Sequence, residues 1–199
     1  MKPPPAVILA QGTSRRMGRD KGLVSLGGRP LVAHVAERLA PQCGGLAING
    51  PETFRAAALT LKAILIDEAT FAGMGPLGGI RSGLIWARYA VPAASHLLVA
   101  PVDMPFLPAD LVARLGDGLD RSDAAIAVSP DGRTVPVLGL WPLSALGAVD
   151  RVLRGQHQNG NGDPPIAHGP EHLEPGHPRQ PQIENGKVVV TARDQSKRL

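Results

Sequence analysis

The sequence is poor in cysteine and in aromatic residues, and it lacks long apolar runs. Cys43 is the single cysteine, so no intrachain disulfide can form and we expect a reducing compartment. Aromatic residues make up only 3% of the chain, so the core must be built from Leu, Val, Ile and Ala. The first apolar run, after Pro5, is about five residues long, too short for a signal-peptide core or a membrane span. We therefore expect a cytoplasmic protein that has no membrane partner.

The chain is long enough for one α/β domain and too short for two ordinary ones. It has 199 residues, of which 43% are hydrophobic, and a formal net charge of +4. A protein that tracks nucleic acid would spread its cations along a helix or along the chain, whereas here they gather in one loop near the start. A small polyphosphate is therefore the favoured anion, and nucleic acid is not expected as a partner. Cys43 has no His or acid near it in sequence and indicates an incidental thiol rather than a nucleophile.

The loop that follows the apolar run 6–10 has the composition of an anion site. Arg15, Arg16, Arg19 and Lys21 place four cations within seven residues, among small and glycine residues whose backbone N–H groups can approach an oxyanion. The spacing matches neither the Walker loop nor the dinucleotide fingerprint. A solvated surface turn is the alternative, but so many cations directly after the first strand favour a phosphate site.

Apolar runs and helical periodicities alternate over residues 6–154. The pattern predicts strands at 6–10, 22–26, 46–48, 63–66, 96–102, 124–128 and 135–140, and helices at 30–40, 52–61, 77–84, 108–115 and 143–153. This alternation predicts a three-layer α/β/α Rossmann-like fold with a mostly parallel sheet, in which ligands bind at the carboxyl ends of the strands.

Polar side chains follow the predicted strands where such a site would form. Asn49, Asp67 and Asp103 each end an apolar run, and they should share one rim of the sheet with the basic loop. An acid such as Asp103 could hold Mg²⁺, while Arg16 and Lys21 could offset the charge that develops during phosphoryl transfer. The alternative for each acid is a helix cap or a turn residue.

The composition changes at residue 156, which predicts one folded domain at 1–155 and a tail at 156–199. Residues 156–182 carry six prolines, four glycines and four of the six histidines, with no aromatic residue, and we expect them to be flexible. The histidines could suggest a metal site, but Pro170 separates two of them and no thiolate partner is present. Asn185 and Gly186 predict the turn of a short hairpin or an edge strand at 183–192.

The segment from Leu9 to Lys21 resembles a family signature that reads leucine-alanine-glycine-glycine, then arginine-methionine-glycine, then aspartate-lysine. The signature belongs to nucleotidyltransferases with a nucleotide-diphospho-sugar-transferase-like fold, and within that group the chain resembles the molybdenum cofactor guanylyltransferases of the MobA type. Further matching pieces follow in the family's order and extend the resemblance over residues 6 to 154: residues 27–31, Asn49, Asp67, residues 75–79 and residues 102–106.

The resemblance implies transfer of GMP from GTP to molybdenum-molybdopterin, with Mg²⁺ as cofactor and pyrophosphate as product. Other molybdenum cofactor assembly proteins and acceptor apo-enzymes are the implied partners. The implied catalytic residues are Arg16, Lys21 and Asp103, with Asp103 as the Mg²⁺ ligand. The implied nucleotide contacts are Leu9, Ala10, Gln11, Gly12, Lys21, Asn49, Asp67, Pro76, Leu77 and Asp103, with the loop of Pro76 and Leu77 helping to tell guanine from cytosine.

The sequence departs from the family pattern in two places. Gln11 stands where the family has the first glycine of its pair, which costs about 1 kcal/mol if that position needs positive φ or a close nucleotide. The family's closing asparagine-x-asparagine-threonine-proline segment is not found; Asn159 and Asn161 have the spacing, but no apolar strand precedes them. Two alternatives therefore stay open: a related nucleotidyltransferase acting on CTP or a sugar 1-phosphate, and a catalytically impaired nucleotide-binding protein.

Overall fold

The protein is built around a seven-stranded sheet. The computed structural model describes residues 2–11, 20–57, 61–121, 123–129, 132–158 and 188–189. Across the sheet the strands lie in the order β5 (Ala63–Leu65), β4 (Gly45–Asn49), β1 (Pro5–Leu9), β6 (His96–Pro101), β8 (Thr134–Pro142), β7 (Ala125–Val128) and β9 (Val188–Val189). The first four run parallel to one another, and β8 is antiparallel to both β6 and β7. The predicted mostly parallel sheet is confirmed.

The interior strand β1 is apolar along its whole length because both of its faces are covered. Ala6 and Ile8 face one core cluster and Val7 faces the other, and all three are fully buried. A strand buried on both faces reads as a continuous apolar run rather than an alternating one, which is what the sequence of β1 shows.

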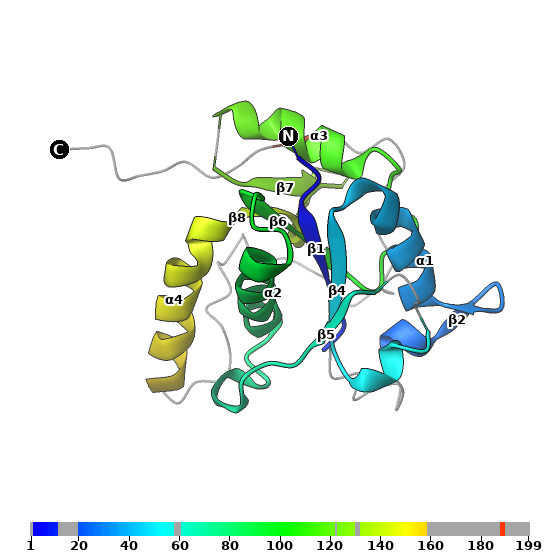
Figure 1. Cartoon of the computed structure of the whole chain (residues 1–199), viewed down its shortest axis with the longest axis horizontal. Coiled ribbons are helices and arrows are strands. Elements are labelled where there is room, and N and C mark those ends of the chain that lie inside the picture. Colours follow the sequence, from blue (N-terminus) through cyan, green and yellow to red (C-terminus); the bar gives the residue numbers. More distant parts are fainter. Residues whose placement is uncertain are drawn as a thin grey trace, which may run out of the picture.

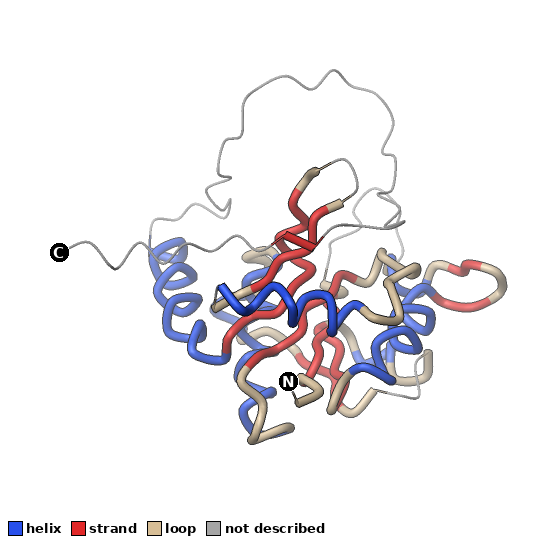
Figure 2. Tube along the Cα trace, turned by 90° about the horizontal axis from the view of Figure 1, so that it is seen from above, coloured by secondary structure: helices blue, strands red, loops and turns tan. Residues whose placement is uncertain are grey.

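Helices cover the two faces of the sheet (Figure 1). One core cluster packs α1 (Leu31–Leu39) and α3 (Leu111–Asp117) against the sheet, and the other packs α2 (Pro76–Ala90) and α4 (Leu146–Gln158) against the opposite face. Figure 2 shows the strands running through the middle of the molecule between these helices. The predicted three-layer arrangement is therefore confirmed, and no helix of the described ranges is both long and apolar enough to cross a membrane.

Four parallel strands end together at one edge of the sheet. Leu9, the last residue of β1, is in register with Asn49 at the end of β4 and with Pro101 at the end of β6. Asn49 is in turn in register with Leu65, the last residue of β5. Side chains that follow these strands are thus brought to one rim, as the positions of Asn49, Asp67 and Asp103 predicted.

The predicted extended piece at 22–26 is largely wrong. Lys21–Leu23 forms a 3-10 turn, and only β2 (Ser25–Leu26) is extended, pairing with β3 (Arg29–Pro30) in a hairpin that projects beside α1 (Figure 1). Gly27 and Gly28 form its turn with φ values of 57° and 81°, a geometry that glycine adopts at little cost.

The predicted helix at 52–61 is wrong for the residues that the structure describes. Glu52–Phe54 forms a single 3-10 turn, and residues 55–57 are turns. Phe54 is fully buried in the core cluster, so this segment crosses from β4 to β5 around one aromatic anchor rather than as a helix that covers the sheet.

Three other helices differ from the prediction at their ends. The helix predicted at 77–84 is longer and runs as α2 from Pro76 to Ala90. The helix predicted at 108–115 begins at Leu111, and the one predicted at 143–153 begins with a 3-10 turn and continues as α4 to Gln158. Within the predicted tail, β9 pairs antiparallel with β7 as an edge strand. The Asn-Gly turn at 185–186 and the asparagines at 159 and 161 lie outside the described residues.

Candidate active site

A cavity of about 310 Å³ opens at the rim where the parallel strands end. Its walls come from six separate segments of the chain. The lining residues are Leu9, Ala10, Gln11, Lys21, Asn49, Asp67, Gly73, Gly75, Pro76, Pro101, Val102, Asp103 and Val137. The ends of parallel strands are where ligands bind in α/β sheets, so the position agrees with the sequence prediction.

The floor of the cavity is the end of β1. The backbone N–H of Ala10 donates to the carbonyl of Asn49 at 2.9 Å, and that of Val102 donates to the carbonyl of Leu9 at 3.0 Å. These bonds carry the sheet ladder to the rim and hold three strand ends together. Gln11 is exposed and lines the cavity, whereas Gly12 and Arg16 lie outside the described residues.

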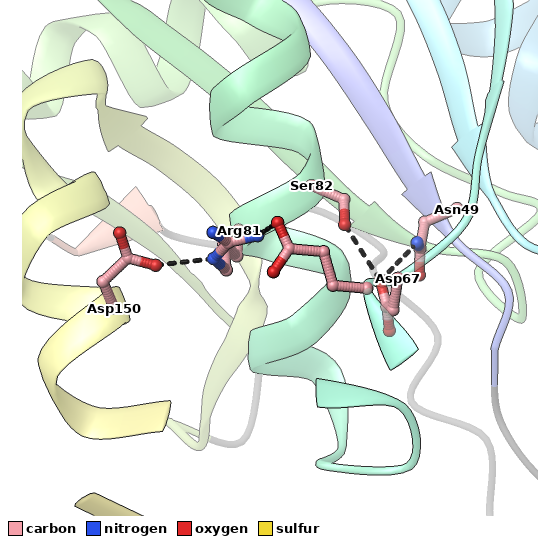
Figure 3. Close-up of polar contacts among 6 residues, drawn as sticks. Asn49, Asp67, Arg81, Ser82 and Asp150 are labelled. Carbon is pink, nitrogen blue, oxygen red and sulfur yellow. Dashed lines mark hydrogen bonds and ion pairs between the residues drawn. The ribbon is translucent and has the colours of Figure 1, made fainter. Parts of the chain in front are cut away.

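A buried amide and a carboxylate form one side of the site (Figure 3). Asn49 is 1% exposed, and its Nδ2 donates to Asp67 Oδ1 at 2.8 Å and to the Leu65 carbonyl at 3.3 Å. Ser82 Oγ, from α2, donates to the same carboxylate oxygen at 3.0 Å. Asp67 is therefore held from two elements, and this pairing explains how β4 can bury a polar residue in an apolar sheet.

Two glycines let the first turn of α2 approach that pair closely. A Cβ at Gly79 would lie 2.4 Å from Asn49 Oδ1, and one at Gly78 would lie 2.7 Å from Asp67 Oδ2. Both distances are far below an ordinary van der Waals contact, so a side chain at either position forces Asn49 or Asp67 to move. The Gly-Gly pair thus brings the helix N-terminus to the rim.

We call residues 66–76, which connect β5 to α2, the wall loop. Gly75 precedes α2 with φ 69° and ψ −159°, a conformation that is nearly restricted to glycine. Pro76 then takes the first position of the helix, where its missing N–H costs nothing. Gly73, Gly75 and Pro76 all line the cavity, so this backbone geometry shapes one of its walls.

Lys21 and Asp103 face each other on the cavity wall. Lys21 Nζ lies 3.6 Å from Asp103 Oδ2, and the two side chains are 49% and 45% exposed. A pair this exposed contributes little to stability, so both groups remain available for a charged ligand. In the described part of the chain no three His, Cys, Asp or Glu side chains gather into a metal site, and Asp67 and Asp103 are the two carboxylates among the described residues that line the cavity.

The cavity unites eight of the residues that the sequence predicted as site residues: Leu9, Ala10, Gln11, Lys21, Asn49, Asp67, Pro76 and Asp103. Leu77 is placed differently, because its side chain packs at the edge of the core cluster beneath α2 and does not line the cavity. Cys43 lies away from the rim, and burial raises the pKa of its thiol to about 12. This thiol is unsuited to nucleophilic chemistry, as its sequence context predicted.

Sequence reasoning missed Ser82 and Val137 as parts of the site. Ser82 could have been found, because it lies one helical turn beyond Gly78 and is a polar residue close to the apolar face of α2. Val137, on the antiparallel strand β8, gave no signal, since it is one apolar residue in an apolar strand.

A larger groove of about 700 Å³ lies beside α3, away from the strand ends, and its chemistry does not suit a nucleotide. Its walls carry the carboxylates of Asp110 and Asp117, which repel a polyphosphate. The Gln42 amide is already used: Nε2 donates to the carbonyls of Arg38 and Pro108, and Oε1 accepts from the N–H of Val112. The smaller cavity at the rim is therefore the candidate active site.

Comparisons with known proteins identify relatives of this chain. The chain is 48% identical over 141 residues to a molybdenum cofactor guanylyltransferase of Cereibacter sphaeroides, which covers 69% of this chain and 68% of that protein. It is 46% identical over 144 residues to a molybdenum cofactor guanylyltransferase of Rhodopseudomonas palustris strain BisB5, covering 69% of this chain and 66% of that protein. The matched stretch thus spans slightly less than two thirds of the Rhodopseudomonas relative.

A solved structure shows the same fold. Molybdopterin-guanine dinucleotide biosynthesis protein A from Archaeoglobus fulgidus superposes with a TM-score of 0.57 at 22% identity, over 80% of this chain and 75% of that one. The model of the MobA-like NTP transferase domain matches residues 6–163, which include every described residue of the cavity. The chain therefore belongs to the MobA-like NTP transferase family.

Proposed function

We propose that this protein transfers GMP from GTP to molybdenum-molybdopterin, forming the molybdopterin guanine dinucleotide cofactor and releasing pyrophosphate. The observation that carries the proposal is the cavity at the strand ends, which joins Lys21, Asn49, Asp67 and Asp103 in one site. The names of the relatives at 46–48% identity support the same reaction. The cytoplasm is the proposed location, and acceptor apo-enzymes together with other cofactor assembly proteins are the proposed partners.

The chain's own residues suit a nucleoside triphosphate. The end of β1 and residues Gly73, Gly75 and Pro76 give the cavity uncharged walls, and Pro76 lies at the N-terminus of α2, where the positive end of the helix dipole favours an anionic ligand. Lys21 brings a flexible cation to the same wall. Asp67 keeps Oδ2 for a ligand, because the bonds from Asn49 and Ser82 both go to Oδ1.

Asp103 fits the role of Mg²⁺ ligand. Mg²⁺ is commonly held by one or two carboxylates together with substrate phosphates and water, and Asp103 is a half-exposed carboxylate on the cavity wall. When bound, the metal neutralises charge on the phosphates during transfer. Lys21, whose Nζ lies 3.6 Å from Asp103 Oδ2, would offer its charge to the phosphates of a nucleotide bound beside that carboxylate.

The proposed reaction needs no covalent enzyme intermediate. The terminal phosphate of the pterin substrate attacks the α-phosphorus of GTP, the bond to the β-phosphate breaks, and pyrophosphate leaves with the electron pair of that bond. The protein contributes position and charge: Asp67 and the wall loop hold the nucleoside, and Lys21 offsets charge on the phosphates. The raised pKa of Cys43 is consistent with a mechanism that uses no thiolate.

A nucleotide panel tests the proposal. Purified full chain is incubated with Mg²⁺, the molybdenum-bound pterin and each of GTP, CTP, ATP and UTP, and pyrophosphate release and dinucleotide formation are measured. We expect GTP to be preferred. Preference for CTP would show a cytidylyltransferase, and binding of GTP–Mg²⁺ without product would show an impaired nucleotide-binding protein of the kind that Gln11 suggests.

A further inference from the structure

Arg81 is a nearly buried cation on α2 that lies behind the candidate active site. It is 8% exposed, its Nη1 lies 2.9 Å from Glu68 Oε1, and its Nε donates to Asp150 Oδ1 at 2.5 Å (Figure 3). Burial opposes the charged form, but the hydrogen bonds to Asp150 and Glu68 outweigh it, and the pKa of Arg81 lies above its usual value. The guanidinium therefore stays charged and joins the wall loop, α2 and α4.

The same guanidinium contacts a second point of the wall loop. Its Cζ lies 4.8 Å from the centre of the Phe71 ring, and that of Arg154, from α4, lies 5.9 Å away. Phe71 is 2% exposed, its N–H donates to the Glu68 carbonyl at 2.8 Å, and its carbonyl accepts from Met74 at 3.2 Å. An aromatic ring fixed in this way anchors the middle of the loop.

Two consecutive residues of α2 thus hold two consecutive acids of the wall loop. Ser82 binds Asp67, which lines the cavity, and Arg81 binds Glu68, which does not. The loop then continues to Gly73, Gly75 and Pro76, which return to the cavity wall. Contacts made by Arg81 outside the cavity therefore bear on the placement of side chains and backbone inside it.

We propose that Arg81 is a positioning residue for nucleotide binding: through Glu68 and Phe71 it fixes the wall loop, and through Asp150 it ties that loop to α4. We call this set of four residues the Arg81 clamp. The inference rests on the proposed function for its ligand, GTP with Mg²⁺. The clamp touches no substrate, so it acts on affinity by holding Asp67 and Pro76 in place.

The Glu68→Gln variant tests the clamp with little risk to the fold. The Glu68 side chain is 56% exposed, so loss of its charge is expected to lower the melting temperature by less than about 3 °C. The wall loop is expected to loosen, raising KM for GTP about three- to tenfold and leaving kcat within about twofold. Glu37→Gln is the matched control. It removes an exposed ion pair between Glu37, on α1, and Arg29, on β3, and it should leave KM for GTP unchanged.

A second variant, Arg81→Lys, keeps a positive charge and loses the planar fork that reaches Glu68 and Asp150 together. It should raise KM for GTP at least as much as Glu68→Gln. A wild-type KM in both variants would overturn the proposal, and so would a fall in kcat with KM unchanged.

An error in the proposed function can be told apart from an error in the clamp. If the unmodified chain neither binds nor turns over GTP, that function is wrong, and hydrogen exchange of the amides at 69–75 then tests the clamp alone. Exchange should be faster in Glu68→Gln than in the unmodified chain and unchanged in Glu37→Gln. Equal exchange in all three proteins would overturn the clamp.

Discussion

Replacement of Gly79 by alanine should damage both the stability of the fold and the binding of nucleotide. The added Cβ would lie 2.4 Å from Asn49 Oδ1 and 2.8 Å from Leu9 Cδ2. Asn49 is 1% exposed and hydrogen-bonded to Asp67, so a shift of its amide breaks that bond. The helix or the amide must shift, and the bond that orients Asp67 at the cavity is lost.

The magnitude follows from three contributions. Overpacking of a tight core costs about 1–3 kcal/mol, and loss of a hydrogen bond to a charged acceptor costs about 1.5–3 kcal/mol. The higher helix propensity of alanine offsets about 1 kcal/mol of this destabilisation. The free energy of unfolding should therefore fall by about 1.5–5 kcal/mol, which lowers the melting temperature by roughly 3–20 °C in a protein of this size.

Gly155→Ala is the matched control. Gly155 lies inside α4, and its Cβ position has no neighbouring atom within 4 Å among the described residues. At this position alanine brings only its higher helix propensity and no steric clash. The Gly155→Ala variant should therefore be about 1 kcal/mol more stable than the unmodified chain. Thermal unfolding and a GTP–Mg²⁺ titration measure both effects, and Gly79→Ala should bind GTP about tenfold more weakly. Equal stability and affinity of Gly79→Ala and Gly155→Ala would refute the argument.

Three further outcomes are expected. Asp103→Asn should lose most turnover and keep its fold, whereas Asp110→Asn, in the groove beside α3, should keep full activity. Lys21→Ala should weaken GTP binding and turnover together, and an unchanged KM and kcat would contradict the role of Lys21. Because the folded pKa of Cys43 is raised to about 12, its thiol should resist iodoacetamide at pH 8 until urea unfolds the chain; its contribution to stability is present below about pH 9 and is lost as the pH rises toward 12.

The sequence was sufficient for the parts of the fold that depend on local pattern. The strands around Ile8 and Val99 are continuous apolar runs, and α2 follows a Gly-Pro start signal that the structure confirms. The predicted helix at 52–61 failed because its one strong anchor, Phe54, is a tertiary contact that no helical periodicity encodes.

The site was predictable where a polar residue ends an apolar run, because parallel strands bring their carboxyl ends to one rim. Asn49, Asp67 and Asp103 were found in this way. Ser82 was not, since its partnership with Asp67 depends on how closely two glycines let α2 approach the sheet. The packing of Leu77 against the edge of the core cluster rather than at the cavity depends on the rotation of α2 about its axis, which sequence spacing leaves undetermined at the first turn.

The strand order has a consequence for synthesis of the chain. β1 is made first, yet one of its two partners, β6, is among the later strands to leave the ribosome. Until Pro101 has emerged, one edge of an apolar strand has no native partner, and such an edge invites pairing with other chains. The cavity floor is formed only when the ladder between β1 and β6 closes, so a chain truncated or stalled before Pro101 should lack nucleotide affinity. GTP binding would then report on the completion of folding.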